Sequence, residues 1–423
     1  MTEAVKEGWR KVRLGEVCKL MSSGGTPSRR NPLFFKNGSF LWVKSQELRD
    51  KSIYDTEEKI TEEALRKSSA KSYPVNTILL AMYGATVGKL GILKVSSTIN
   101  QAICGMVVNE QVADYRFLFY LLLFKRGDLI AKAFGAAQQN LNQDLIKNFD
   151  ILLPPLHIQR KIAAILSAYD DLIENNTRRI QILEEMAQTI YKEWVVKFRF
   201  PGYEKVKMVD SELGPIPEGW AVKRLGDVVD PQYGYTESAS EDEVGPKYVR
   251  GTDINKTSYI QWDSVPYCPI NEANHTKFKL VVGDILVIRM ADPGKVGIVE
   301  KEIDAVFASY LIRLHIKSNS LSPYYLFHFL LSDRYQDYVT GASTGTTRKS
   351  ASAGVITDID IIIPANDIRE QFEEEISTLR LMLNKLLDKN AILRRTRDLL
   401  LPKLISGEVD VTTLDLTMGG SEA

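Results

Sequence analysis

The chain has 423 residues, too many for one typical domain and suited to two globular units of about 150 residues plus connectors. Lysine plus arginine and aspartate plus glutamate each total 54, so the net charge is zero and no overall field indicates nucleic acid or a membrane as partner. Cys18, Cys104 and Cys268 share no metal-binding or redox spacing and are expected to be reduced, buried thiols. The chain shows no apolar signal core at its start and no run of about 18 apolar residues. These features predict a cytoplasmic protein whose basic surfaces are local.

The sequence repeats itself. GWRKVRLGEV at Gly8 to Val17 returns as GWAVKRLGDV at Gly219 to Val228. Three further pairs continue the likeness: WVKSQELRDKSI with YVRGTDINKTSYI, VGKLGIL with PGKVGIV, and DILLPPLHIQ with DIIIPANDIREQ. Small insertions and deletions shift the two copies against each other. A duplicated chain predicts a partner with two similar, separated sites.

In chain order, the sequence predicts a first globular unit over residues 1–155, a central helix over 156–200, a second unit over 201–366, a distal helix over 367–407 and a tail over 408–423. Within each unit, short β-branched runs broken by glycine, aspartate and proline indicate strands and turns. A helical stretch interrupts them at about Asp114 to Phe134 and again at about Pro323 to Val339, where apolar residues follow the helical period. Each unit is therefore predicted to be mixed α and β.

The two long helices carry the clearest periodicity in the chain. Apolar residues step by three and four, with one stutter at Asn176, a pattern typical of coiled coils. The first series is Ile158, Ile162, Ile165, Tyr169, Leu172, Asn176, Ile180, Leu183, Ala187, Ile190 and Trp194. The second series is Ile368, Phe372, Ile376, Leu379, Leu383, Leu386, Asn390, Leu393, Arg397, Leu400 and Leu404.

Antiparallel pairing of these helices would hold the two units apart. A helix of about 40 residues is roughly 60 Å long, more than the about 34 Å of one turn of duplex DNA. Asn176 and Asn390 occupy similar places in the two series. Each amide either lies in the seam, where it would fix the register of the coiled coil, or faces solvent.

Several segments together resemble a known family. They are GWRKVRLGEV followed by SSGGTPSR, then TVGKLGIL, FGAAQQNLNQDLIKNFDILLPPLHIQRKIAAIL, the connector GPIPEGWAVKRLGDV and the terminal LLLPKLISGEVD. In this order, and duplicated, they resemble the specificity subunits of type I restriction-modification systems over essentially the whole chain. The resemblance implies an α+β fold with an internal pseudo-two-fold repeat. Two target recognition domains would be joined by two antiparallel coiled-coil spacer helices.

The same resemblance implies a function. Each target recognition domain would read one half of a bipartite, asymmetric site in double-stranded DNA, and the spacer helices would also dock methyltransferase subunits, two in number, and nuclease/translocase subunits. The chain itself would be non-catalytic and hold no cofactor, while S-adenosylmethionine, ATP and Mg²⁺ would enter through the partners. Three alternatives stay open: a protein-protein scaffold without DNA readout, a P-loop nucleotide hydrolase, and a specificity subunit of a simpler type II-like nuclease-methylase.

Candidate DNA contacts follow from chemistry, since base edges pair with amides, guanidinium groups and hydroxyls, and phosphates with lysine, arginine, serine and threonine. Such residues cluster in matching loops of the two units. The candidates in the first unit are Thr26, Ser28, Arg29, Arg30, Lys44, Ser45, Gln46, Tyr83, Lys89, Gln138, Gln139, Asn140 and Asn142. Those in the second unit are Tyr233, Tyr235, Thr236, Arg250, Thr252, Asp253, Arg289, Lys295, Thr344, Thr346, Thr347, Arg348 and Lys349.

Other residues indicate a structural role, or resemble functional motifs that are incomplete. The duplicated Gly88-Lys89 and Gly294-Lys295 indicate a shared turn with a phosphate-facing lysine, and Trp9 and Trp220 are expected to fill the cores. GATVGK at Gly84 to Lys89 is one residue short of a P-loop and lacks its hydroxyl residue. The four histidines, His157, His275, His315 and His328, lack the spacing of a metal site. No catalytic constellation is therefore predicted.

Overall fold

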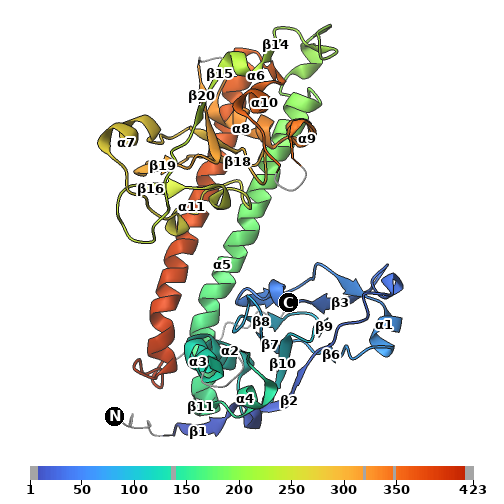
Figure 1. The fold of residues 1–423 in the computed structure, drawn as a ribbon, viewed down its shortest axis with the longest axis vertical. Coiled ribbons are helices and arrows are strands. Elements are labelled where there is room, and N and C mark those ends of the chain that lie inside the picture. Colours follow the sequence, from blue (N-terminus) through green and yellow to red (C-terminus); the bar gives the residue numbers. More distant parts are fainter. Residues whose placement is uncertain (1–7, 135–139, 318–320, 346–348, 415–423) are drawn as a thin grey trace. The chain divides into compact units, whose positions relative to one another are not determined.

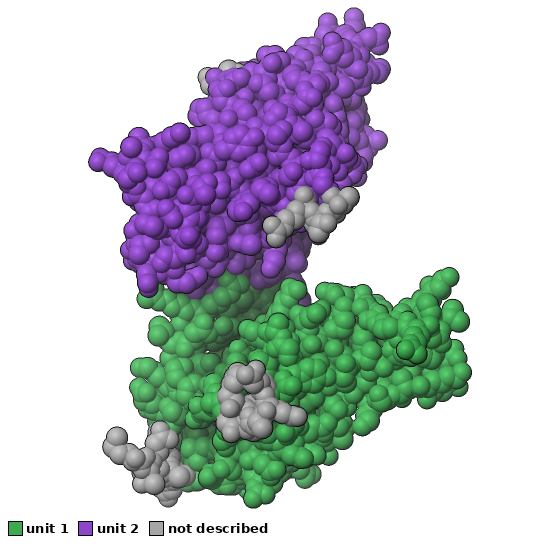
Figure 2. All heavy atoms as spheres, in the orientation of Figure 1, with its two compact units in different colours: residues 1–174, 392–423 green, residues 175–391 purple. Residues whose placement is uncertain are grey.

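A computed structural model describes residues 8–134, 140–317, 321–345 and 349–414 (Figure 1). The chain forms two compact units: unit 1 comprises residues 1–174 and 392–423, and unit 2 comprises residues 175–391 (Figure 2). Each unit contains a mixed α/β head and a part of each of two long helices. The predicted α+β class with two similar heads and two long helices is confirmed.

The head of unit 1 is built on short strands. They are β1 (Arg10–Arg13), β2 (Cys18–Ser23), β3 (Phe40–Val43), β4 (Lys51–Ile53), β5 (Lys59–Ile60), β6 (Ser72–Tyr73), β7 (Ile78–Ala81), β8 (Leu90–Leu93), β9 (Ser97–Ile99), β10 (Ile103–Val108) and β11 (Asp150–Leu153). Sheets form in the orders β2-β10-β7-β8-β4 and β5-β3-β9-β6, and β1 pairs with β11. Helices α1 (Glu62–Arg66), α2 (Tyr115–Phe124), α3 (Arg126–Phe134) and α4 (Gln143–Lys147) complete the head.

The head of unit 2 repeats this plan with shorter sheets. Its strands are β12 (Met208–Val209), β13 (Ile216–Pro217), β14 (Ala221–Arg224), β15 (Val229–Tyr233), β16 (Lys247–Val249), β17 (Ile285–Ile288), β18 (Val296–Ile298), β19 (Ala305–Phe307), β20 (Leu311–Ile316) and β21 (Asp360–Ile363). They pair in the orders β15-β20-β17-β18, β16-β19, β14-β21 and β12-β13. The helices are α6 (Leu225–Val228), α7 (Glu272–Phe278), α8 (Pro323–Leu331), α9 (Asp333–Ala342) and α10 (Ala353–Thr357).

Each helical stretch expected inside a head is a pair of helices. Asp114 caps α2 by accepting hydrogen bonds from the backbone N–H groups of Arg116 and Phe117, and the helix ends at Lys125 before α3. In unit 2, Ser332 both ends α8 and caps α9. Hydroxyl and carboxylate side chains are good N-caps because they satisfy the first free N–H groups.

The repeated opening motif has the same structural role in both units. β1 runs antiparallel to β11, with Arg10 opposite Leu153, and β14 runs antiparallel to β21, with Ala221 opposite Ile363. Each head is thus closed by a strand from its beginning and a strand from its end. A long helix starts directly after the closing strand in both copies, at Leu156 and at Asn366.

The long helices are α5 (Leu156–Tyr191), which is followed by a π-helical turn (Lys192–Val196), and α11 (Asn366–Ile405). Inside unit 2, Asn176 contacts Asn390 while Tyr191 packs on Phe372, so the two helices run antiparallel. One member of the predicted apolar series is misplaced, because Leu172 is 47% exposed. The stutter explains this, since it shifts the apolar stripe around the helix.

Asn176 and Asn390 lie in the seam of unit 2. They are 3% and 1% exposed, and Nδ2 of Asn176 donates a hydrogen bond of 2.9 Å to Oδ1 of Asn390. The alternative of solvent-facing amides is thereby excluded. A buried amide pair of this kind favours the register in which both groups meet.

Polar contacts also join the helices to each head. In unit 1, Asp170 of α5 accepts hydrogen bonds from the Tyr120 hydroxyl on α2 and from Arg397 on α11. In unit 2, Arg380 of α11 is 1% exposed and its Nε donates to Oε1 of Glu300 at 2.8 Å. A buried ion pair of this geometry is costly to break at one partner.

The expected core positions are only partly right. Trp220 is 7% exposed and packs against Phe198 and Phe200, as predicted. Trp9 is only half-buried and lines a surface pocket together with Pro155 and Val411. Cys104 and Cys268 are buried and Cys18 is half-buried, with no disulfide among the three thiols.

Candidate nucleic-acid interface

The two heads have structurally equivalent positions, which we call the shared frame. The first is a glycine directly after β2 in unit 1 and directly after β15 in unit 2. A Cβ atom at Gly24 would lie 1.9 Å from the carbonyl oxygen of Ile99, and one at Gly234 would lie 2.3 Å from that of Ala308. Only glycine permits so close an approach of two backbones. The next residue accepts a hydrogen bond from an aromatic side chain in both copies. Trp42 Nε1 donates to the carbonyl of Gly25 at 3.1 Å, and the Tyr248 hydroxyl donates to that of Tyr235 at 2.8 Å.

The predicted shared turn is present in both heads. Gly88 and Gly294 have φ values of 79° and 93°, and their N–H groups donate to Ala81 and Ile288 at 2.9 Å. The turn of unit 1 is one residue longer, so Ala81 corresponds to Ile288 and Met82 to Arg289. The hydrogen bonds confirm this, because Leu141 donates to Met82 as Ala351 donates to Arg289. Met82, and not the neighbouring candidate Tyr83, is therefore the structural counterpart of Arg289.

Two cations of unit 1 that were candidates for DNA are held by carboxylates. Arg29 Nη1 and Nη2 donate to the two oxygens of Glu58 at 2.6 and 3.0 Å, and its guanidinium carbon lies 4.2 Å from the ring centroid of Phe35. Lys44 Nζ lies 2.8 Å from Glu57 and 3.0 Å from Glu58. The hydrogen bonds from Arg29, followed by Lys44, lower the pKa of Glu58 to about 2. Charge of both signs therefore lies at this surface.

The remaining candidates of unit 1 lie in different surroundings. Lys89 forms an ion pair of 3.0 Å with Asp50, which also binds Arg126. Asn142 caps α4 by accepting from the N–H of Leu145 at 2.8 Å, and Thr26 donates to Gln101. Ser28, Arg30, Gln46 and Asn140 are exposed, whereas Ser45 and Tyr83 are half-buried. Gln138 and Gln139 lie outside the described residues.

In unit 2, Arg250 and Asp253 bind each other. Asp253 Oδ2 accepts from the backbone N–H of Arg250 at 2.8 Å, and Oδ1 lies 3.1 Å from Arg250 Nη2. In unit 1, Glu47 accepts from the N–H of Lys44 at 2.9 Å in the same manner. The carboxylate therefore closes a turn that the repeat conserves between its copies, and Asp253 is a structural residue as well as a predicted DNA contact.

Four other candidates of unit 2 come together on one surface. Arg289 lies over the ring of Tyr233, with 4.9 Å from its guanidinium carbon to the ring centroid. Lys349 accepts a backbone hydrogen bond from Ala291, two residues beyond Arg289, and Thr344 pairs with Ser350. We call this set, Tyr233, Arg289, Thr344 and Lys349, the loop surface of unit 2.

Among the described residues, no hydrogen bond, ion pair or ring contact links the other candidates of unit 2 to the loop surface. Thr236, Thr252 and Lys295 are exposed, and Tyr235 is half-buried against Phe278. Thr346, Thr347 and Arg348 lie outside the described residues. Sequence reasoning missed Tyr310, which is 56% exposed and whose carbonyl accepts from the N–H of Arg289 at 3.0 Å. It also missed Ser23, which takes the place of Tyr233 in unit 1 and accepts from Gln143 at 2.9 Å.

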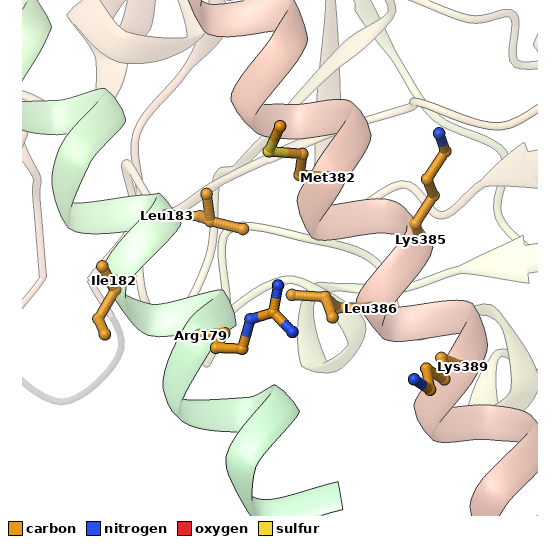
Figure 3. A pocket seen from close by; sticks show the side chains of 7 residues that line it. All are labelled: Arg179, Ile182, Leu183, Met382, Lys385, Leu386 and Lys389. Atoms are coloured by element: carbon orange, nitrogen blue, oxygen red, sulfur yellow. The ribbon is translucent and has the colours of Figure 1, made fainter. Parts of the chain in front are cut away.

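A groove of about 350 Å³ lies between α5 and α11 within unit 2 (Figure 3). Apolar and basic side chains from both helices line it: Arg179, Ile182, Leu183, Met382, Lys385, Leu386 and Lys389. Ile182 and Met382 are 54% and 52% exposed. The groove therefore presents apolar surface that the described part of the chain does not cover.

The described ranges contain no group of three or more histidine, cysteine, aspartate or glutamate side chains that could hold a metal ion. None of the helices within these ranges is both long enough and apolar enough to pass through a membrane. His328 is buried, and its Nδ1 lies 3.0 Å from the side-chain oxygen of Gln188.

Comparison with known proteins gives a consistent result. Residues 6–185 and 217–389 match the type I restriction modification DNA specificity domain. The chain is 28% identical over 418 residues to the type I restriction enzyme MjaIX specificity subunit of Methanocaldococcus jannaschii, covering 95% of this chain and 93% of that protein. It is 28% identical over 199 residues to the EcoR124I/EcoR124II specificity subunit of Escherichia coli, covering 46% and 49% of the two chains.

Its fold is similar to that of the type I restriction-modification S subunit from M. genitalium, with a TM-score of 0.57 at 16% identity, over 96% of this chain and 98% of that one. The two family matches fall on the two copies of the repeat, and each includes one head and part of its following helix. The chain therefore belongs to the family of type I restriction-modification specificity subunits.

Proposed function

We propose that the chain reads a bipartite, asymmetric DNA sequence, with one half-site bound by each head. The observation that carries this proposal is that the two heads share their frame positions but differ in the residues of the adjoining loops. Gly24 and Gly234 occupy the same position of the frame, whereas the adjoining residues are Ser23 in one copy and Tyr233 in the other. Two readers built alike but with different surfaces suit two different half-sites.

The loop surface of unit 2 offers the chemistry that such reading needs. Guanidinium and amide groups recognise base edges, and lysine and hydroxyl groups contact phosphates. Arg289 and Lys349 supply the cations, and Thr344 supplies a hydroxyl. In unit 1 the exposed Arg30, Gln46 and Asn140 are the corresponding candidates. Arg29 and Lys44, which pair with Glu58 in the free protein, would leave this carboxylate and bind a DNA phosphate instead.

The chain serves as a non-catalytic subunit in this proposal. Methyltransferase subunits, two in number, and nuclease/translocase subunits carry out the chemistry with S-adenosylmethionine, ATP and Mg²⁺, and the assembly acts on DNA in the cytoplasm. The apolar and basic groove between α5 and α11 supports docking of a partner, because exposed apolar patches on a helix pair commonly bind a further helix (Figure 3). The two helices serve as spacers between the half-sites.

Single-molecule sequencing of the methylated bases in the native host tests this proposal. We expect one bipartite motif with modified adenines in both halves, separated by a fixed unspecified spacer. The motif should vanish when the gene for this chain is deleted and return when it is restored. A methylome that is unchanged by the deletion would contradict the proposal and favour a scaffold without DNA readout.

A further inference from the structure

We infer that Arg289 is the residue with which unit 2 recognises a guanine in the major groove of its half-site. This inference rests on the proposed DNA-reading function and makes it specific. The first support is the fixed position of the residue. Arg289 directly follows β17, its N–H donates to the Tyr310 carbonyl at 3.0 Å, and its carbonyl accepts from Ala351 at 2.9 Å. Three chain segments thus hold its backbone.

Stacking orients the side chain. Its guanidinium lies over the Tyr233 ring at 4.9 Å, and the Tyr233 hydroxyl accepts a hydrogen bond of 3.0 Å from the N–H of Ala353. The ring is therefore anchored on the strand at one end and by this hydrogen bond at the other. Arginine stacks readily on aromatic faces because its guanidinium is planar and weakly hydrated. This contact limits the directions in which the donors of Arg289 can point.

The donors of Arg289 are poorly used within the protein. Nη1 has one long hydrogen bond, 3.5 Å, to the carbonyl of Ser309, and Nε is buried without a partner among the described residues. Within the same described ranges, no carboxylate forms an ion pair with it. Arg29, Lys44, Lys89 and Arg250, in contrast, each have an acidic partner. The charge of Arg289 is therefore not neutralised by a carboxylate, and its guanidinium stays available for DNA.

Guanine is the base that such a side chain fits. Its O6 and N7 atoms accept a bidentate pair of hydrogen bonds from one guanidinium, the commonest specific contact between arginine and DNA. The corresponding residue of unit 1 is Met82, which is 5% exposed. A cation at the position of Arg289 is therefore not shared by the two heads. It belongs to the positions where the two heads differ, and those positions determine specificity.

The test uses the full-length chain copurified with its partner subunits and a library of DNA duplexes with randomised sequence. Bound duplexes are sequenced for the wild type and for Arg289→Lys and Arg289→Met. The lysine variant keeps the charge but lacks the planar fork, and the methionine variant carries the residue of unit 1. We expect Arg289→Met to lower the preference for guanine at one position of one half-site by about tenfold or more, and Arg289→Lys to lower it less, because lysine also contacts guanine. The other half-site should keep its sequence.

Lys349→Ala is the matched control, since it removes an exposed cation from the same surface. A lysine that contacts phosphate should weaken binding equally for all sequences. An unchanged guanine preference in Arg289→Met would overturn the inference, as would a uniform loss of binding in both Arg289 variants. If the wild-type complex itself selects no bipartite motif, the proposed function fails. If it selects one that the variants leave intact, only the role of Arg289 fails.

Discussion

His328 lies on α8 among aromatic rings, stacked on Tyr191 and close to Phe372. Burial, assisted by the nearby charge of Arg380, lowers the pKa of His328 from 6.5 to about 3. The folded unit therefore holds this histidine neutral, with Gln188 as its hydrogen-bond partner. A buried neutral histidine makes stability depend on pH.

We expect unit 2 to lose stability as the pH falls from 6.5 towards 3. In this window the unfolded chain binds a proton at His328 that the folded chain does not, so the free energy of unfolding falls by up to about 1.4 kcal/mol per pH unit. The stability that the neutral His328 contributes is fully present above its pKa in the unfolded chain, 6.5. Urea denaturation at several pH values should show this slope reduced in His328→Asn. His315→Asn, at an exposed position, should keep it. Equal slopes in both variants would contradict the assignment.

Residue-level pairing limits what could be predicted for the site. The sequence identified Arg29, Lys44 and Lys89 as candidate DNA-binding cations. Their acidic partners, Glu58 for the first two and Asp50 for Lys89, lie 14 to 39 residues away along the chain, and only the fold brings them together. The counterpart of Arg289 in unit 1, Met82, was not among the candidates, because a turn differs in length between the copies. Contacts made across the chain are invisible to local pattern reading, whereas residue types in loops are not.

At the level of elements, periodicity predicted the most. The steps of three and four identified α5 and α11, and the duplicated motifs identified strands that pair in the same register in both heads. The split of the short helices at Lys125 and Ser332 was not predicted, since caps interrupt a helix without breaking its apolar pattern. The burial of Arg380 was not predicted either, because charged side chains are rarely buried unless they are paired.

The amide pair of α5 and α11 makes a prediction for these elements. Asn176→Leu deprives Asn390 of its 2.9 Å partner in a buried seam and should lower the free energy of unfolding by about 1 to 3 kcal/mol. The double variant Asn176→Leu and Asn390→Leu should recover much of that loss, because two apolar residues pack where two amides did. Urea denaturation measures both. Leu172→Ala, at an exposed position of the same helix, should change stability by less than about 0.5 kcal/mol.

A different order of stability would change the assignment of this pair. If the single and the double variant lose the same free energy, the amide pair contributes through something other than mutual hydrogen bonding. If Leu172→Ala costs as much as Asn176→Leu, the apolar stripe includes Leu172 and the seam has been misplaced.

For the whole molecule, the repeat separates what is shared from what is specific. Frame positions such as Gly24 with Gly234 are alike in both copies, and loop positions such as Met82 with Arg289 are not. The fold and the two-headed plan could thus be predicted from the sequence, because the duplication is visible along its whole length. The surface that reads each half-site could be predicted only as a set of loops.

Exchange of one head tests most directly whether each head binds one half-site. The segment Tyr203 to Pro364 is replaced with the corresponding segment of another member of the family, and the methylated motif is determined by single-molecule sequencing in a host that carries the partner subunits. We expect one half-site to change to that of the donor protein, while the other half-site is retained. An unchanged motif, or a change in both half-sites, would contradict the assignment of one half-site to each head.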